Sequence, residues 1–137
     1  MPKVTVHRKA HFNSAHRLYR KDWSNEKNFE VFNKCSNPNF HGHNYELIVS
    51  LTGEIDPETG YVYDLGILKN YIKSEIEEAF DHKNLSVEVP EFDNLNPTAE
   101  NISVVIYGKL RKLLPQHLAL KVTLYETPRN FVTYSGE

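Results

Sequence analysis

Two histidines separated by one glycine are the residues in this chain that most directly suggest metal binding. His41 and His43 lie in the stretch KCSNPNFHGHNY, where a strand-like segment begins. Side chains two residues apart on a strand point to the same side, so both imidazoles can bind one ion. A third imidazole, His16 in SAHR, ends an earlier strand-like segment that can pair beside them. Three neutral imidazoles and a water are typical of catalytic zinc, whereas two surface histidines flanking a turn are the simpler alternative.

Cys35 is the only cysteine of the chain and comes shortly before His41. A lone cysteine is most often a small buried apolar residue. Here Lys34 precedes it in a polar loop, and a cation and a metal ion nearby would favour the thiolate, the form that acts as a base or nucleophile. A thiolate is also a metal ligand, and as a fourth ligand Cys35 would make the site closed and structural.

Asp81 and His82 form an adjacent acid–imidazole pair just after a helical pattern ends. An aspartate that accepts a hydrogen bond from one ring nitrogen raises the basicity of the other, as a proton shuttle requires. The ordinary alternative is a histidine that binds the last carbonyl groups of the helix.

Glu126 follows an alternating segment, in LYET. It is either an ordinary strand end or the floor of a pocket. A carboxylate at that place is suited to the paired N–H groups of a guanidine-like ring edge, which it binds through two parallel hydrogen bonds.

The elements that would position these residues follow from the periodicity of apolar residues. Alternation predicts four strands, over residues 3–14, 43–54, 118–126 and 130–136. Helical spacing predicts an amphipathic helix over 65–80 with Asp64 as its N-cap, and a second helix that Pro97 opens and Pro115 stops.

Two connections complete the organisation. The polar stretch 19–40 is long for a small domain, which indicates a functional loop or a short helix, and Ser24 is placed to cap such a helix. The stretch 81–97 is predicted to be a loop.

The order strand–strand–helix–helix–strand–strand predicts an α+β fold in two layers, a four-stranded antiparallel sheet with both helices on one face. We expect a single domain over 1–137, because a chain of 137 residues is too short for two cores. The two edge strands of such an open sheet have unpaired main-chain N–H and C=O groups, which favours pairing with neighbouring subunits.

Composition excludes several classes of function. Sixteen basic against eighteen acidic residues leave the chain near neutral, which argues against a nucleic-acid binder. No apolar run is long enough to span a membrane, and the first residues are not a signal segment. A lone cysteine cannot form an internal disulfide, so we expect a cytoplasmic protein.

These pieces together resemble the 6-pyruvoyl-tetrahydropterin synthase family, which includes the related 6-carboxytetrahydropterin synthases. The resemblance covers nearly the whole chain, through SAHR, NKCSNPNFHGHNY, GEIDPETGYVYDL, FDHKNL, NPTAEN and YET in that order. It implies the tunnelling fold (T-fold) of order ββααββ, in which three domains close into a ring and two rings stack as a homohexamer.

The resemblance also implies a reaction. Its substrate is 7,8-dihydroneopterin triphosphate, which loses triphosphate while its side chain undergoes internal redox rearrangement to give 6-pyruvoyl-tetrahydropterin. The implied cofactors are Zn²⁺ and Mg²⁺, with no nicotinamide.

The family's site residues carry over to this sequence residue by residue. The implied zinc ligands are His16, His41 and His43. The implied catalytic residues are Cys35, as a thiolate base, and the proton-relaying pair Asp81 and His82, which the resemblance places in a neighbouring subunit's site. The implied substrate-binding residues are Glu126 at the N3 and 2-amino edge of the pterin, Thr98 beside it, and Glu100 as a supporting residue.

One residue departs from the family pattern. Phe40 stands where a small residue is expected, and it either narrows the pocket mouth or packs on the loop.

The number of residues between the cysteine and His-Gly-His separates two types of enzyme within the family. The 6-carboxytetrahydropterin synthases of queuosine (deazapurine) biosynthesis act on the same substrate but have a shorter spacing between cysteine and His-Gly-His. The five residues SNPNF here favour the pyruvoyl-forming type. A non-catalytic zinc module and a pterin-binding protein without turnover are the alternatives from other classes.

Overall fold

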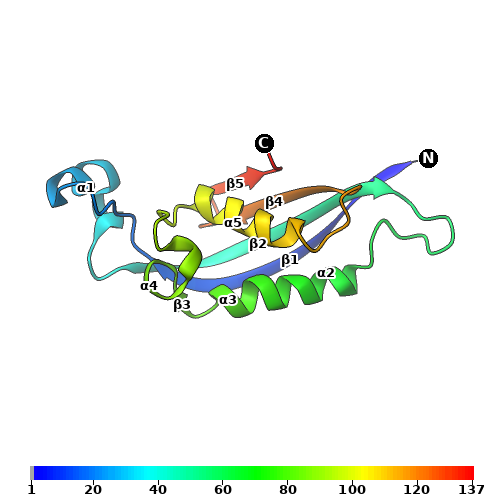
Figure 1. Ribbon diagram of the computed structural model, residues 1–137, viewed down its shortest axis with the longest axis horizontal. Helices are drawn as coiled ribbons and strands as arrows, with labels where there is room; N and C mark the ends of the chain where they lie inside the picture. Colours follow the sequence, from blue (N-terminus) through cyan, green and yellow to red (C-terminus); the bar gives the residue numbers. More distant parts are fainter. Residues whose placement is uncertain (1) are drawn as a thin grey trace.

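The computed structural model describes residues 2–137, and its central feature is a five-stranded sheet (Figure 1). The strands are β1 (Lys3–His16), β2 (His41–Glu54), β3 (Lys83–Asn84), β4 (Ala119–Tyr125) and β5 (Phe131–Tyr134). They lie in the order β3-β1-β2-β4-β5, and every neighbouring pair is antiparallel except β1 and β3. The four predicted strands and the α+β class are confirmed, and the two-residue β3 adds a short parallel edge.

Helices occupy the connections between the strands. The α-helices are α1 (Asn25–Phe32), α2 (Leu65–Ile72), α3 (Glu78–Phe80), α4 (Leu85–Glu88) and α5 (Ala99–Arg111). Shorter 3₁₀ turns are formed by Asn33–Ser36 and Pro90–Phe92, and a π-helical turn, Lys73–Glu77, joins α2 and α3 into one rod. Within residues 2–137, none of the helices combines the length and the apolar character needed to cross a bilayer.

The two side chains predicted to cap the N-termini of helices, Ser24 and Asp64, do so. The side-chain oxygens of Ser24 and Asp64 accept hydrogen bonds from the first turns of α1 and α2. The helix α5 was predicted to begin at Pro97. It begins two residues later, at Ala99, and Thr98 is its N-cap. These caps fix where each helix leaves the loop that precedes it.

The prediction of a loop over 81–97 is wrong in part. The segment contains β3, α4 and the turn Pro90–Phe92. Each of these spans four residues or fewer, too few for a strand or helix period to appear in the sequence. Buried Leu85, Val89 and Phe92 close the core at this end.

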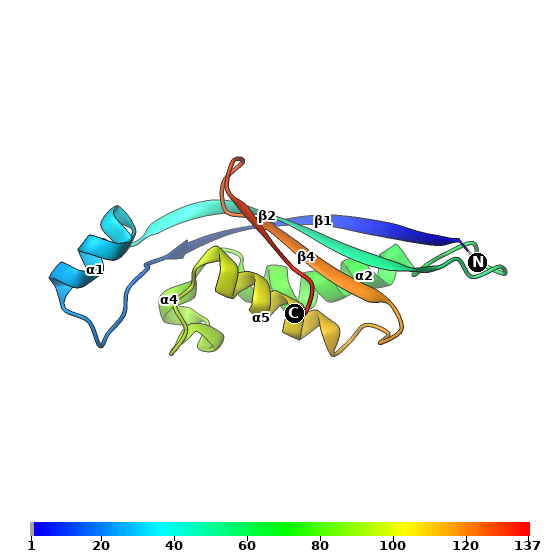
Figure 2. The ribbon, with the colours of Figure 1, turned by 90° about the horizontal axis from the view of Figure 1, so that it is seen from above.

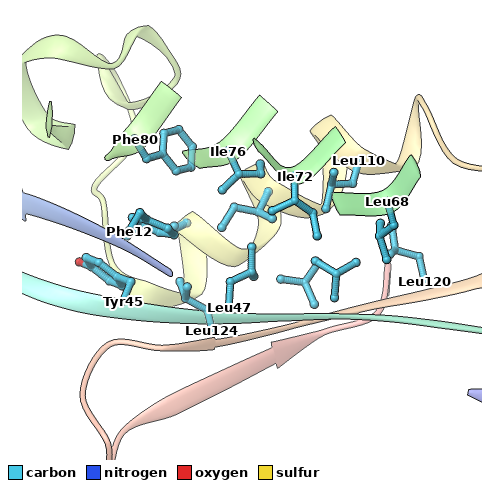
Figure 3. Packing of buried hydrophobic residues seen from close by; sticks show 14 of the residues in the cluster. Phe12, Tyr45, Leu47, Leu68, Ile72, Ile76, Phe80, Leu110, Leu120 and Leu124 are labelled. Carbon is cyan, nitrogen blue, oxygen red and sulfur yellow. The ribbon is translucent and has the colours of Figure 1, made fainter. Parts of the chain in front are cut away.

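The core lies between the sheet and the helices α2, α3 and α5, which cover the same face (Figure 2). Along β2 the alternating residues Tyr45, Leu47, Val49 and Leu51 are fully buried. Figure 3 shows two of them, Tyr45 and Leu47, on the sheet side of the core, across from the helical stripe that includes Leu68, Ile72 and Ile76. A slip of one residue would turn this set to the opposite face, so the packing fixes the register of the sheet.

The opposite face of the sheet is polar, and no helix of residues 2–137 covers it (Figure 2). Cross-strand hydrogen bonds join side chains along β1 and β2: Thr5 with Thr52 at 2.7 Å, His7 with Ser50 at 2.6 Å, and Asn13 with Asn44 at 2.6 Å. His7 is thus on the side of the sheet away from the core.

The β1–β2 pairing determines which residues meet at the end of the sheet. It runs from Lys3 opposite Glu54 to His16 opposite His41. The connection that carries α1 leaves from this last pair and extends beyond the sheet (Figure 1).

Candidate metal centre and active site

Three imidazoles from two adjacent strands converge at the end of the β1–β2 pairing. His16 lies opposite His41, and His43 lies two residues further along β2 on the same side. The ring centroids are 4.6 Å apart for His16 and His41, 5.0 Å for His16 and His43, and 5.1 Å for His41 and His43. One nitrogen from each ring lies within 4.8 Å of the other two. The structure therefore brings together the three residues predicted as metal ligands.

The Nε2 atoms of these three histidines are buried and have no hydrogen-bond partner among residues 2–137. A buried polar atom without a partner costs about 1–3 kcal/mol, and each such atom in a native protein calls for an explanation. Three of them facing one another are explained by a cation that all three bind. Neutral imidazole nitrogens suit Zn²⁺, so the donor set fits the metal that the sequence predicts.

Pro97 sets the orientation of the most buried ligand. The Nδ1 atom of His16 donates to the Pro97 carbonyl at 2.7 Å. A carbonyl can only accept, so Nδ1 carries the ring proton and Nε2 keeps its lone pair for a metal. The Tyr45 hydroxyl lies 3.3 Å from the same Nδ1.

Burial also favours the uncharged form of two of the three histidines, His16 and His41. Burial, and then the neighbouring His41 and His43, lower the pKa of His16 to about 4 against the opposing effect of the Pro97 bond. Burial and His43 likewise lower the pKa of His41, which Glu126 partly opposes. His16 is therefore neutral near pH 7, the state in which an imidazole binds a metal.

Glu126 lies directly beside the three histidines. It follows β4, and its carboxylate oxygens are 3.9 Å from His16 Nε2 and 4.0 Å from His43 Nε2. These distances are too long for hydrogen bonds, and about a quarter of the side chain is exposed. The structure thus places a partly exposed carboxylate beside the three imidazoles, and its predicted role as a pocket-floor acceptor stays a prediction.

Cys35 lies in the Asn33–Ser36 turn and is half-buried. Its sulfur does not belong to the group of converging ligand atoms, which contains histidine nitrogens alone. Burial, followed by the negative charge of Glu126, raises the pKa of the thiol. Burial and the Glu126 carboxylate thus oppose the thiolate in the metal-free chain, and the expected thiolate depends on a metal ion beside it.

Asp81 and His82 form the predicted pair, but they lie on the outer edge of β1. Asp81 accepts from the Asn13 amide at 2.8 Å and lies 2.9 Å from His82 Nδ1. The Asn13 bond, more than His82, lowers the pKa of Asp81. The His82 side chain is 84% exposed and points away from its own chain, so one chain does not bring this pair to the imidazole cluster.

Thr98 and Glu100 lie at the start of α5, next to Pro97. The Thr98 hydroxyl accepts from the Asn101 amide at 3.2 Å as the helix cap, and its side chain is half-buried. Glu100 is exposed in the first turn. Thr98 is thus close in sequence to the carbonyl that holds His16, whereas Glu100 faces solvent.

Phe40 has a left-handed backbone, with φ of 66°. Left-handed residues favour glycine, which gives a physical reason for a small residue at this position. Its side chain lines a cavity of about 960 Å³ together with Phe32, Phe92 and Pro97. That cavity is not lined by any of the three histidines, so within one chain Phe40 packs on the loop side rather than at the metal centre.

Two contributors to the site were missed by the sequence reasoning. The Pro97 carbonyl orients His16, and the Asn13 main chain anchors Asp81. Both act through backbone atoms, which carry no signal in residue type.

Comparisons with known proteins agree with this geometry. A family model described as 6-pyruvoyl tetrahydropterin synthase matches residues 5–137. The 6-pyruvoyl tetrahydrobiopterin synthase of Homo sapiens is 48% identical over 135 residues, which cover 98% of this chain and 93% of the human protein.

This chain belongs to the 6-pyruvoyl tetrahydropterin synthase family. The corresponding protein of Pongo abelii is 49% identical over 98% of this chain and 93% of its own length. The solved 6-pyruvoyl tetrahydropterin synthase of Caenorhabditis elegans superposes with a TM-score of 0.95 at 42% identity, over 100% of this chain and 98% of that one. The predicted family and its T-fold are therefore confirmed.

Proposed function

We propose that this chain is a zinc-dependent 6-pyruvoyl-tetrahydropterin synthase that converts 7,8-dihydroneopterin triphosphate to 6-pyruvoyl-tetrahydropterin and releases triphosphate. The observation that carries the proposal is the set of three unpartnered Nε2 atoms that face one another in a chain 48% identical to such a synthase over 98% of its residues. A neutral His₃ set without a thiolate ligand is typical of open, catalytic zinc sites rather than closed, structural ones.

His16, His41 and His43 would hold Zn²⁺. When bound, the ion supplies Lewis acidity toward the hydroxyl groups of the substrate side chain. The Pro97 carbonyl holds His16 in the metal-binding tautomer, and burial keeps that ring neutral. Mg²⁺ is the second cation that we assign to turnover.

Glu126 would anchor the pterin through its N3 and 2-amino N–H groups, which a carboxylate matches with two parallel bonds. Its oxygens lie 3.9–4.0 Å from two of the imidazole nitrogens, so a pterin bound to Glu126 would lie next to the three histidines. Thr98 would assist at the pterin, and Glu100 would support it from the first turn of α5. Such anchoring lowers the activation barrier, because it holds the reacting atoms at contact distance.

Cys35 would remove the carbon-bound proton of the substrate side chain as a thiolate. Its sulfur does not belong to the cluster, its thiol is half-buried in a short turn, and the charge of Glu126, which lies beside the histidines, raises the pKa of this thiol. A cation bound by the histidines would counter the charge of Glu126 and favour the thiolate.

Asp81 and His82 would relay protons during the later rearrangement. The Asp81 carboxylate holds His82 through Nδ1, which leaves Nε2 free as the acid or base. Because His82 is exposed on the outer edge of β1, we assign the pair to the site of a neighbouring subunit. The assembly that meets this need in the family is a homohexamer of two stacked trimers, which we propose for this chain.

The test is incubation of the purified zinc protein with 7,8-dihydroneopterin triphosphate and Mg²⁺, with products identified by mass. We expect 6-pyruvoyl-tetrahydropterin and triphosphate, and no product from the Cys35→Ala variant. Release of acetaldehyde with 6-carboxytetrahydropterin would assign the queuosine-type reaction instead. Unchanged substrate would contradict an enzymatic function, and a zinc-binding or pterin-binding module without turnover would be the remaining interpretation.

A further inference from the structure

The backbone of His82 is left-handed, with φ of 58°. His82 lies in the turn between α3 and β3, outside both elements. A residue that carries a Cβ atom adopts this conformation at a steric cost, and it persists only where the surrounding structure holds it. Since the His82 side chain is 84% exposed, packing of the ring does not supply that restraint. Contacts of the main chain must therefore hold the turn.

Asn13 of β1 makes those contacts through its own main chain. Its N–H donates to Asp81 Oδ1 at 2.8 Å, and its carbonyl accepts from the His82 N–H at 2.6 Å. The second carboxylate oxygen, Asp81 Oδ2, lies 2.9 Å from His82 Nδ1. The three contacts form a closed ring that passes from Asn13 through the carboxylate and the imidazole and back to Asn13. One residue of β1 thus restrains the carboxylate, the backbone of His82 and, through the carboxylate, the imidazole.

The place of Asn13 in the sheet leaves both of its main-chain groups available. Asn13 lies opposite Asn44 in the β1–β2 pairing. In an antiparallel pair, every second residue points its N–H and its C=O away from the partner strand. Both groups of Asn13 bond to the turn, so Asn13 is such a residue. The turn is therefore anchored on the sheet at no cost to the hydrogen bonds between β1 and β2.

The start of the same turn is held by the next residue of β1. The Ser14 hydroxyl, which is buried, donates to the Phe80 carbonyl at 2.6 Å. The Phe80 ring is fully buried and lies edge-on to Phe12, with ring centroids 5.6 Å apart. The chain thus passes from the core at Phe80 to solvent at His82 within two residues, and Asn13 binds it where the restraint of the core ends.

We propose that Asn13 is a positioning residue for the proton relay, because its main-chain N–H and C=O hold Asp81 and the left-handed backbone of His82 and so set the direction of the imidazole. A relay must lie within hydrogen-bond reach of the proton that it transfers. An exposed ring on an unrestrained turn would sample many directions. The bonds to Asn13 supply the alignment that burial supplies elsewhere. This inference rests on the proposed function for the role of Asp81 and His82 as the relay.

The test compares Asn13→Pro with Asn13→Ala. Both variants lose the side-chain bond to Asn44, and only proline also lacks the N–H that binds Asp81. Because that N–H faces away from β2, proline leaves the bonds between β1 and β2 in place. We expect kcat of Asn13→Pro to be about 100-fold below that of Asn13→Ala, since a displaced relay loses its alignment.

Zinc content and KM should be the same in the two variants, because the three histidines and Glu126 are unaltered. Equal kcat values would overturn the proposal. Loss of zinc from Asn13→Pro together with its activity would also overturn it, because the proline would then have distorted β1 as a whole.

The titration of Asp81 separates positioning from general damage. The bond from the Asn13 N–H is the largest cause that lowers the pKa of Asp81. The carboxyl carbon of Asp81, followed by NMR, should therefore titrate at higher pH in Asn13→Pro than in Asn13→Ala. The other charged groups that act on this carboxylate, His82 and His11, are present in both variants. The same titration in both variants would show that Asn13 does not hold Asp81.

A further measurement needs no substitution. The His82 amide of the unaltered zinc protein should exchange its hydrogen slowly although the side chain is exposed, because the N–H is bonded to the Asn13 carbonyl. Exchange as fast as in an unfolded chain would overturn the proposal. If the unaltered protein shows no turnover, the proposed function fails, but the exchange of His82 and the titration of Asp81 still decide whether Asn13 holds the pair.

Discussion

The Nδ1 atom of His16 lies 2.7 Å from the carbonyl oxygen of Pro97, a residue 81 positions further along the chain. This bond connects the last residue of β1 to the loop that begins α5. It decides which nitrogen of His16 faces His41 and His43, because the ring proton must lie on Nδ1. A proposed metal ligand is thus oriented by the main chain of a distant segment, where no side-chain substitution removes the acceptor.

The zinc-free chain should lose stability in mild acid because of His16. Its pKa falls from 6.5 to about 4 on folding, so the unfolded state takes up the proton first as the pH decreases. The stabilising contribution is complete above pH 6.5 and is lost as the pH falls to about 4, by about 3 kcal/mol in the free energy of unfolding. Urea unfolding across this range measures the slope.

The control for this prediction is on the other face of the sheet. His16→Gln should flatten the acid slope, whereas His7→Gln should keep it, because His7 bonds Ser50 away from the core. Equal slopes in the two variants would show that His16 is not the group responsible.

Cys35→Ser should separate catalysis from metal binding. Removal of a proton-transferring group reduces turnover by about 10²–10⁴-fold. Zinc content should not change, because the sulfur is outside the cluster of ligand nitrogens. Metal analysis alongside kcat checks both parts. Loss of zinc together with activity would instead identify Cys35 as the fourth ligand of a closed site.

Mixing two inactive variants should restore activity if the catalytic groups come from different chains. Cys35→Ala and His82→Ala, dissociated and reassembled in equal amounts, can form sites that combine an intact Cys35 with an intact His82. Random assembly gives about one quarter of the unaltered activity when each site draws on two subunits. Each variant reassembled alone is the control. A mixture as inactive as its components would place both residues in the site of one chain.

Phe40→Gly should be more stable than Phe40→Ala by about 1 kcal/mol, because only glycine adopts the left-handed backbone without strain. Both variants lose the ring, so the comparison isolates the backbone conformation at φ of 66°. Thermal or urea unfolding of the zinc-free proteins measures the difference. Alanine equal to glycine would mean that the turn before His41 relaxes when the ring is removed.

Alternation of apolar residues predicted the strands well because the buried face of β2 repeats without interruption from Tyr45 to Leu51. The same period placed His41 and His43 on one side, and antiparallel pairing supplied His16. Sequence could not supply the Pro97 carbonyl, since any residue offers one. Nor could it show that the charge acting on Cys35 is that of Glu126 rather than that of Lys34, because Glu126 follows β4, which comes beside β2 only in the folded chain.

The proposed metal ligands and the proposed base lie on different parts of the chain, which has an evolutionary consequence. The three histidines belong to the β1–β2 pairing, whose geometry the core enforces, whereas Cys35 belongs to the segment between these strands, which contributes no residue to the pairing. Insertions, deletions and substitutions in this segment can alter the reaction without disturbing the arrangement of the three histidines. A single ancestral scaffold can in this way diversify its chemistry and keep its metal.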